Sequence, residues 1–427
     1  MKNNSSKKYM LLQQGLTLIE LMVALAVGMF LVLGIVQLYS NVSSINRVQT
    51  GLARLQENGR FAVLRMSTDL RMTGAQYCAA TSNAYPDFTT GYQSTRATSV
   101  WVNNVAGLPS PTAADDTPPV PAAGEPWLLS SRFYLQGHEC DSVGSCIPNI
   151  AASVTGSDTW GVPSSGTSVG QRALGADVVT VRYLVGEGDS IAADTNDLDP
   201  IVTTTNIGNP PLEFEAGDLA LLSSCLRSDV FAVTAGGNNL SHLAGDGNVA
   251  DVSLTYERGV DARVYNFSKN FRTITYYLGI KLDPNNSTRK ISSLYRQENG
   301  TAQEIIEGVE RMDVLYAVET GAGTTSLLTA DQVESRNGGA LTCPKTIAAF
   351  SVTTDPGCLW DSVKTIEVSL LLNTVENYAP TENEPYTYSP DGSSVKDPAA
   401  GIPSGLSPGN MMRREFNFTV NLRNKNL

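Results

Sequence analysis

Cysteine is the residue type with the clearest chemistry in this chain of 427 residues. Six cysteines are present, and in a region exported from the cytosol an even number of cysteines favours disulfides. Closeness along the chain predicts two short pairs and leaves a third: Cys140 with Cys146, Cys343 with Cys358, and Cys78 with Cys225. Free buried thiols are the alternative, because spacing alone does not choose one connectivity. No CxxC spacing occurs, so a zinc site is not predicted.

Three motifs resemble pieces of catalytic or metal sites without the surroundings that such sites require. Residues 166–170 match the GxSxG motif of serine hydrolases, but Pro163 and two serines precede them where a strand is needed, which predicts a loop. His138 begins a partial zinc motif that lacks its second histidine, so we expect a surface loop residue. Residues 194–199 carry carboxylates spaced as in part of a calcium loop, but the required glycine and glutamate are missing, which favours a solvated loop. We therefore predict no enzyme activity, no metal and no cofactor.

The charge balance argues against nucleic acid as a partner. The chain has 42 Asp plus Glu against 30 Lys plus Arg, a net charge of −12. An acidic surface repels a phosphate backbone. Removing residues 1–15 would take away three lysines and no acid, which lowers the net charge from −12 to −15. This counts against a role in DNA uptake, which a gel-shift assay would test.

The N-terminus has the composition of a membrane anchor. A basic head, residues 1–15, contains Lys2, Lys7 and Lys8 and no acid, and an apolar run follows from Leu16 to Ser40. About 20 apolar residues cross a bilayer as a helix. Because basic residues stay on the cytoplasmic side, the head is predicted to be cytoplasmic and the body to lie outside. We expect a single-pass membrane protein with a cytoplasmic head and a body outside the cytoplasm.

Glu20 is an acid five residues into this apolar run. A carboxylate within a membrane is costly, and such residues usually have a partner. One interpretation is a glutamate close enough to the head groups to remain hydrated. The other is that cleavage between Gly15 and Leu16 creates an α-amine near the same depth. Glu20 could then pair with its own amine or with that of a neighbouring copy, which would make the acid an assembly device.

Residues 14–23, Gln-Gly-Leu-Thr-Leu-Ile-Glu-Leu-Met-Val, resemble the class III signal of type IV prepilins. In that family a prepilin peptidase cuts after the glycine and methylates the new N-terminus. The resemblance implies that Gly15 ends the leader, that Leu16 becomes the methylated first residue and that Glu20 is the assembly glutamate. Leu16 stands where the family most often has phenylalanine.

The remaining pattern predicts an α+β fold of pilin type. No proline occurs from Leu16 to Tyr85, and apolar steps of three, four and seven predict one helix from Leu16 to about Thr73, stopped by Gly74. Its first half would be the transmembrane and fibre-core helix (16–40), and its amphipathic continuation (41–74) would pack on an antiparallel sheet. The globular domain, 75–427, contains a stretch at 79–170 that is predicted to be a loop-rich insertion. Strands are predicted at 177–185, 218–224, 229–235, 273–280, 292–296, 303–306, 309–318, 365–372 and 415–422.

These strands are expected to form one meandering antiparallel sheet. The two strands on either side of residues 225–228 suggest a hairpin, and Asn299 with Gly300 signals a turn after the strand at 292–296. Residues 415–422 alternate apolar and polar side chains, which fits a sheet with one buried face.

Several short segments also resemble the PilW type of minor pilin. They are residues 55–62, 69–72, 217–219, 225, 228–231, 294–296, 307–310, 413–416 and 422–424. The resemblance implies a low-abundance structural subunit that primes pilus assembly and sits at or near the tip. Its implied partners are other minor pilins and the major pilin, through the N-terminal helix, and a large PilY1-like tip adhesin. Twitching motility and cell adhesion are the implied processes.

Two other functions are compatible with the N-terminus. A minor pseudopilin of a type II secretion system would have the same signal, and the PilW-like segments favour the pilus over it. A membrane-tethered binding module would keep its first 15 residues and would carry a working pocket in the body. Mass spectrometry of the mature N-terminus separates this module from the pilin.

Overall fold

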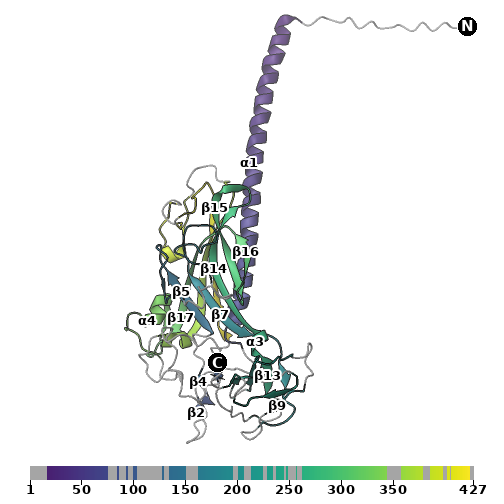
Figure 1. The fold of residues 1–427 in the computed structure, drawn as a ribbon. Coiled ribbons are helices and arrows are strands. Elements are labelled where there is room, and N and C mark those ends of the chain that lie inside the picture. The colour runs from purple at the N-terminus through teal and green to yellow at the C-terminus, as the bar shows by residue number, and fades with distance from the viewer. Residues whose placement is uncertain are drawn as a thin grey trace, which may run out of the picture. The chain divides into compact units, whose positions relative to one another are not determined.

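A computed structural model describes residues 17–75, 134–150, 162–195, 201–205, 213–224, 228–233, 237–244, 247–248, 256, 262–343, 357–377, 385–397, 402–403 and 405–423. It also describes the short strands at 84–85, 93–94, 100–102 and 127–128. The chain divides into two compact units, Met1–Ala53 and Arg54–Leu427. The long helix α1, Leu18–Arg71, has residues in both units (Figure 1).

The helix α1 contains 54 residues, which corresponds to a length of about 81 Å at 1.5 Å per residue. Its last residue, Arg71, precedes the predicted end by two residues. The predicted stop, Gly74, has a φ of +68°, a conformation that suits glycine and ends the helical hydrogen bonding. Its N–H donates to the carbonyl oxygen of Arg182 at 2.9 Å, so the chain joins a strand as soon as it leaves the helix.

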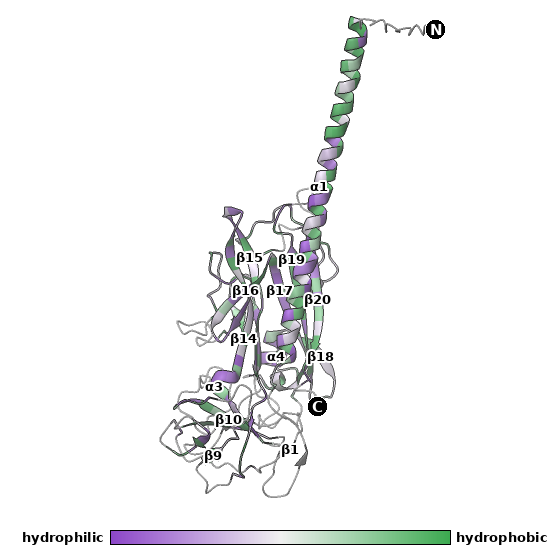
Figure 2. Cartoon of the chain, turned by 90° about the vertical axis from the view of Figure 1, so that its right-hand side faces the viewer, coloured by the Kyte–Doolittle hydropathy of each residue, from purple (hydrophilic) through white to green (hydrophobic). Residues whose placement is uncertain are grey.

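The part of α1 in the first unit exposes its apolar side chains. Between Leu18 and Ile45 the large apolar residues that are exposed have exposed fractions from 53% to 77%. Figure 2 shows this half of α1 as predominantly hydrophobic in colour. The helix is long enough and apolar enough to cross a membrane, with a mean hydropathy of 2.6 in its most apolar window. Exposed apolar surface of this extent marks contact with lipid or with other proteins.

The second unit contains a six-stranded antiparallel sheet. Its spatial order is β16-β15-β14-β7-β5-β6. The strands are β16 Thr301–Glu307, β15 Asn286–Glu298, β14 Phe271–Asp283, β7 Val178–Leu184, β5 Leu135–Cys140 and β6 Cys146–Ile147. Between β15 and β16, Asn299 and Gly300 both have positive φ, as a two-residue hairpin turn requires. The turn predicted at this position is confirmed.

A four-stranded antiparallel sheet forms the second part of the body. Its order is β18-β17-β19-β20, with β18 Thr325–Leu328, β17 Val309–Glu319, β19 Val363–Asn373 and β20 Arg413–Asn421. In β20 the predicted alternation is present: Phe416, Phe418 and Val420 are at least partly buried, whereas Asn417 and Thr419 are exposed. The short helix α4, Ala330–Ser335, and a 3-10 turn, Cys358–Ser362, lie between β18 and β19 in the sequence.

One hydrophobic core joins both sheets to the second half of α1. The helix contributes Leu55, Ala62, Met66 and Leu70, which are at most 2% exposed and follow each other in steps of seven, four and four. This spacing keeps them on one face of a helix. The predicted α+β architecture, with an amphipathic helix against antiparallel sheets, is confirmed.

A third sheet belongs to a separate lobe with a core of its own. Its order is β4-β3-β11-β10-β13-β8, and only the β3–β11 pair is parallel among the described strands. The strands are β4 Trp127–Leu128, β3 Val100–Val102, β11 Ser228–Ala232, β10 Leu219–Ser223, β13 Arg263–Asn266 and β8 Asp189–Ser190. Helix α3, Phe267–Asn270, follows β13 directly. The predicted hairpin around residues 225–228 is the β10–β11 pair.

Two small antiparallel pairs complete the described strands: β12 Asn239–Ser241 with β9 Ile201–Thr203, and β1 Ala84–Tyr85 with β2 Gln93–Ser94. A 3-10 turn also occurs at Ser389–Asp391. Phe231 and Leu240 are fully buried in the lobe core, which is distinct from the core around α1. The expectation of one meandering sheet is therefore incomplete, because the body contains two sheets around one core and a lobe around another.

Two details of the loop-rich stretch differ from the prediction. Residues 135–140 form β5, which pairs with β7 inside the main sheet, so this part of 79–170 is integral to the body. His138 lies on β5 and is only 3% exposed, so its assignment to a surface loop was wrong. Its Nδ1 lies 2.8 Å from the carbonyl oxygen of Pro148, a contact that gives the buried polar ring a hydrogen-bond partner.

Candidate functional site

Glu20 lies in the first turn of α1 and is exposed, with a partner three residues before it. Its carboxylate accepts from the backbone N–H of Thr17 at 3.0 Å and from the Thr17 hydroxyl at 2.9 Å. The backbone N–H of Glu20 points back to the Thr17 hydroxyl oxygen at 3.4 Å. These reciprocal contacts form a capping box, which satisfies N–H groups that the helix start leaves unpaired. The Thr-x-x-Glu spacing is the sequence signal that could have predicted this role of Thr17.

The remaining processing residues, Gly15 and Leu16, lie outside the described residues. In the first unit, an open apolar groove of about 390 Å³ runs beside Glu20 and is lined by Ile19, Val23, Ala24 and Val27. Glu20 is the one charged residue from Leu18 to Asn46, on a helical surface that is mostly apolar as far as Leu38. Such a surface can pack against other apolar helices. A cation that pairs with Glu20 must then lie at the same level along the helix axis.

At the other end of α1, Asp69 attaches the helix to the main sheet. Its carboxylate accepts from Arg296 Nε at 2.6 Å, from the Tyr276 hydroxyl at 2.5 Å and from the Tyr183 hydroxyl at 2.8 Å. Arg296 also donates to Glu298 at 2.5 Å. Burial opposes the ionisation of Asp69, but these hydrogen bonds and the charge of Arg296 outweigh it and hold its pKa below the usual value.

A second buried ion pair links β17 to β20. Arg413 donates to Glu310 through Nε at 2.6 Å and through Nη2 at 2.9 Å, a bidentate pair between two buried side chains. The side-chain amide of Asn373 on β19 donates to the same carboxylate at 2.8 Å. Because every group in this network has partners, its burial is compatible with a stable core.

These two networks bring together segments that the PilW resemblance named separately. Asp69 comes from 69–72 and Arg296 from 294–296, while Glu310 comes from 307–310 and Arg413 from 413–416. The sequence marked the segments, but not their pairing, since the partners are 227 and 103 residues apart. We infer that these PilW-like segments supply the buried ion pairs that hold α1 to the main sheet and β17 to β20.

The structure contains the Cys140–Cys146 and Cys343–Cys358 disulfides, which are the two short pairs expected from the sequence. The third expected pair, Cys78 with Cys225, lies outside the described residues. Cys140–Cys146 closes the β5–β6 hairpin, and Cys343–Cys358 joins the segment after α4 to the 3-10 turn before β19.

A cluster of acids lies near Cys140 between β5, β17 and α4. Burial, followed by the charges of Asp313 and Asp331, raises the pKa of Glu139 to about 7. Burial raises the pKa of Asp177 well above its usual range, and the charges of Glu139 and Asp313 add to this effect. The hydroxyl of Tyr316, which both Asp177 and Glu139 affect electrostatically, is fully buried without a hydrogen-bond partner. Within the described ranges no three His, Cys, Asp or Glu side chains could hold a metal ion.

The hydrolase-like motif at 166–170 is an irregular loop whose Ser168 is exposed, with no helix following it. In the acidic stretch at 194–199, only the first two residues belong to the described part of the chain. The prediction of calcium binding there is therefore untested.

Comparison with known families identifies two regions of the chain. Residues 10–36 match the prokaryotic N-terminal methylation motif, and residues 276–424 match the family described as Type IV Pilus-assembly protein W. No curated protein and no solved structure matches the chain.

The methylation motif, the exposed apolar helix and the sheets packed on its second half are the features expected of a type IV pilin. The match over 276–424 covers β14 to β20, the strands that carry Arg296, Glu310 and Arg413. Together the two matches support a type IV pilin of the PilW type.

Proposed function

We propose that this protein is a minor pilin that primes assembly of a type IV pilus and remains at or near the pilus tip. The proposal is carried by one observation: Glu20 is a single acid on an exposed apolar helix, and its contacts within the described chain come from Thr17 alone. Such a surface needs other helices to cover it, and such an acid needs a cation at its own depth.

In this mechanism prepilin peptidase cuts after Gly15 and methylates Leu16. The new amine, on the same chain or a neighbouring pilin, pairs with Glu20 as the subunit leaves the inner membrane. The apolar half of α1 then packs among the helices of other minor pilins and of the major pilin. The body, held to α1 by Asp69, would present its surface to a PilY1-like tip adhesin. The protein would be an inner-membrane protein before assembly and extracellular afterwards, and it would have no catalytic role.

The central test replaces Glu20 with alanine in the full chain and measures its amount in sheared pili and in membranes. We expect Glu20→Ala to be processed normally but lost from pili, with lower surface piliation, because the acid no longer attracts a neighbouring amine. Glu57→Ala is the matched control, since Glu57 is an exposed glutamate of the same helix. Normal incorporation of Glu20→Ala would refute the mechanism.

Two further measurements separate the alternatives. Mass spectrometry should find a methylated N-terminus at Leu16, whereas a membrane-tethered binding module would keep its lysine-bearing head. Deletion of the gene should stop twitching motility and leave protein secretion intact, whereas a pseudopilin of type II secretion would give the opposite result.

A further inference from the structure

Three arginines in the described chain are more than nine-tenths buried: Arg172, Arg296 and Arg413. Two of them form ion pairs, Arg296 with Asp69 and Arg413 with Glu310. Arg172 has no carboxylate within ion-pair distance among the described residues, and its Nε has no hydrogen-bond partner. A buried guanidinium normally has an anionic partner, because burying an unpaired charge is costly. Arg172 is the exception, so we expect its partner to be a neighbouring group that is neutral in this structure and can become an anion.

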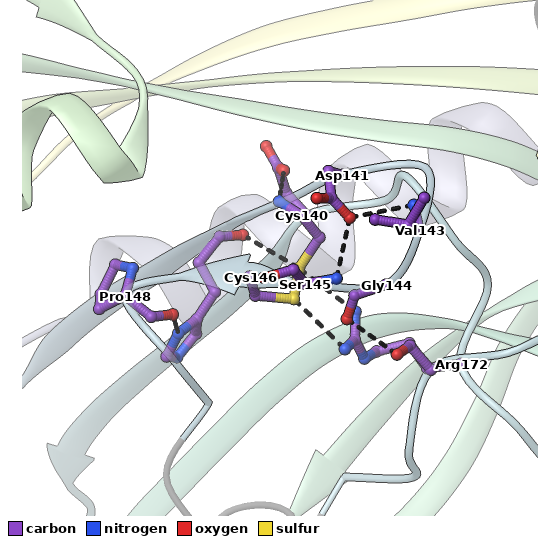
Figure 3. Close-up of a disulfide and its surroundings, with 11 residues drawn as sticks. Cys140, Asp141, Val143, Gly144, Ser145, Cys146, Pro148 and Arg172 are labelled. Atoms are coloured by element: carbon purple, nitrogen blue, oxygen red, sulfur yellow. Dashed lines mark hydrogen bonds between the residues drawn. A yellow bond between two sulfur atoms is a disulfide. The ribbon is translucent and has the colours of Figure 1, made fainter.

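The groups that Arg172 does contact are the two sulfurs of a disulfide. Figure 3 shows the guanidinium beside the Cys140–Cys146 bond, with Nη1 3.3 Å from Cys140 Sγ and Nη2 3.3 Å from Cys146 Sγ. A disulfide sulfur is a weak neutral acceptor, whereas a thiolate is a full anion. Each sulfur therefore has its own charged donor already in position for the reduced state.

The position of Arg172 is fixed by its backbone rather than by the disulfide. Its N–H donates to the carbonyl oxygen of Ser164 at 2.9 Å, and its carbonyl oxygen accepts from Gly166 at 2.9 Å. The acid that affects it electrostatically, Asp177, uses its carboxylate for the backbone N–H groups of Cys140 and Val314. Asp177 therefore does not take the place of an ion-pair partner for Arg172.

The disulfide lies beneath an exposed loop. Residues 141–145 connect the two cysteines, and Val143 in this loop is 82% exposed. The Asp141 carboxylate orders the loop by accepting from the N–H groups of Val143 at 3.0 Å and Ser145 at 2.8 Å. The cysteines themselves remain 7% and 5% exposed, whereas Cys343 and Cys358 are 2% and 0% exposed.

We propose that Cys140–Cys146 is a thiol–disulfide exchange site for an external dithiol, activated by Arg172. A thiolate of the dithiol attacks Cys146 Sγ, the bond between the two cysteines breaks, and Cys140 leaves as a thiolate that accepts from Arg172 Nη1. The second thiolate of the dithiol then attacks the mixed disulfide and releases Cys146, which Nη2 stabilises. Two electrons pass to the protein and the dithiol becomes a cyclic disulfide, while its two protons go to solvent or to a released sulfur.

The direction of the effect follows from the chemistry of exchange. A neighbouring arginine lowers the pKa of a thiol, and a leaving thiolate of lower pKa leaves faster. Stabilising the reduced form also makes the disulfide easier to reduce. Cys343–Cys358 is the second disulfide of the described chain and serves as an internal reference.

The test titrates the full chain with dithiothreitol, traps free thiols by alkylation in acid-quenched samples and counts them by mass spectrometry. Cys140–Cys146 should be reduced at a dithiothreitol concentration about tenfold or more below that for Cys343–Cys358, because a hydrogen bond to a charged group contributes roughly this factor. Simultaneous reduction of both pairs, or earlier reduction of Cys343–Cys358, would overturn the proposal.

The two disulfides also differ in ring size and in burial, so the role of Arg172 needs its own measurement. Arg172→Gln should raise the required dithiothreitol concentration about tenfold, and Arg172→Lys should give an intermediate value because it keeps the charge but loses the two-pronged geometry. An unchanged midpoint in Arg172→Gln would overturn the proposal.

A second readout remains if Arg172→Gln does not fold. In the reduced wild-type chain, alkylation of Cys140 and Cys146 should reach half its maximal rate well below about pH 8.5, the ordinary thiol pKa. Ring size does not affect this value. A half-maximal rate at or above pH 8.5 would show that Arg172 does not activate either thiol.

Discussion

The two halves of α1 share one backbone conformation but differ in where their side chains find partners. In the first unit, Glu20 is bonded only to Thr17 in its own turn, and the surrounding apolar residues are exposed. In the second unit, Asp69 has partners on three strands, and the neighbouring Met66 and Leu70 are fully buried. A side chain without a charged partner among the described residues indicates contact with another molecule, whereas a side chain with a complete set of partners indicates a fixed attachment.

The largest expected effect on the folded body comes from Asp69→Ala. The change leaves Arg296 and two tyrosine hydroxyls buried without their shared acceptor, which costs about 3–5 kcal/mol of unfolding free energy for a buried ion pair. Chemical denaturation of the detergent-solubilised chain, followed by tryptophan fluorescence, measures this loss. Trp360 is a suitable probe because it is fully buried in the same core.

Glu57→Ala is the control for Asp69→Ala, because Glu57 is an exposed acid of the same helix. We expect it to change the unfolding free energy by less than about 0.5 kcal/mol, as is usual for surface substitutions. Equal stabilities of the two variants would contradict the assignment of Asp69 as the attachment point. They would also remove the contrast between the halves of α1.

A smaller effect is expected from Gly59→Ala. A Cβ at residue 59 would lie 2.2 Å from Cζ of Phe416 on β20, so the ring or the helix must move. Overpacking of this kind costs about 1–3 kcal/mol. The same denaturation experiment should show this loss, and Phe416→Leu should restore part of it in the double variant.

Gly28→Ala is the matched change in the first half of α1, where a Cβ would meet nothing within 4 Å. Alanine is the better helix former, so helix content in micelles should stay the same or rise while the stability of the body does not change. A loss of body stability in Gly28→Ala would show that the two halves are coupled in the monomer.

The parts of the fold that were predicted correctly are those with a local cause. The helix follows from uninterrupted apolar spacing, and the turn at Asn299 and Gly300 follows from their tolerance of positive φ. The strand β5 was missed because Gly137 and His138 favour a loop, and only its pairing with β7 makes the segment a strand. Gly137 is required there by the Tyr316 hydroxyl, which would lie 1.9 Å from a Cβ.

The candidate site shows the same limit. Glu20 could be identified from sequence because an acid in an apolar run is anomalous on its own. Arg172 could not, because its significance depends on two sulfurs 32 and 26 residues away and on the absence of a nearby carboxylate in the described structure. Whether a buried charge lacks an ionic partner depends on residues far away in the sequence, so only the structure reveals it.

The stability of the body is expected to depend on pH, because the body contains a cluster of acids with raised pKa values. No such cluster is described in the first half of α1. Burial and the charges of Asp313 and Asp331 raise the pKa of Glu139 to about 7 from an ordinary value of 4.5. The folded protein thus holds a proton that the unfolded chain releases. Its contribution to stability is fully present below about pH 4.5 and is lost as the pH rises through about 7.

Denaturation of the full chain at several pH values between 5 and 8.5 measures this slope. The unfolding free energy should fall as the pH rises, and Asp177, whose pKa is also raised, adds to the fall. Glu139→Gln should flatten the curve, because glutamine does not titrate. The effect should be smaller than that of Asp69→Ala, since Glu139 is partly exposed and therefore screened. A wild-type stability that rises over this range would contradict the raised pKa.

The smallest expected effect is that of Thr17→Val, which sharpens the contrast at the start of α1. The valine side chain cannot donate to Glu20 or accept from its N–H, so the two hydroxyl bonds of the capping box are lost and the first turn should fray. The bond from the backbone N–H of residue 17 to the Glu20 carboxylate remains possible. Hydrogen exchange of the amides in this turn, measured in micelles, should accelerate several-fold, as expected for loss of an N-cap. Thr68→Val is the control, because the Thr68 hydroxyl donates to a carbonyl oxygen within the helix and does not cap it.

Thr17→Val also tests assembly. If Thr17 only occupies the Glu20 carboxylate until a neighbouring amine replaces it, Thr17→Val should leave both body stability and incorporation into pili intact. Loss of incorporation in Thr17→Val to the level of Glu20→Ala would mean that the local cap, and not the acid alone, is needed for assembly.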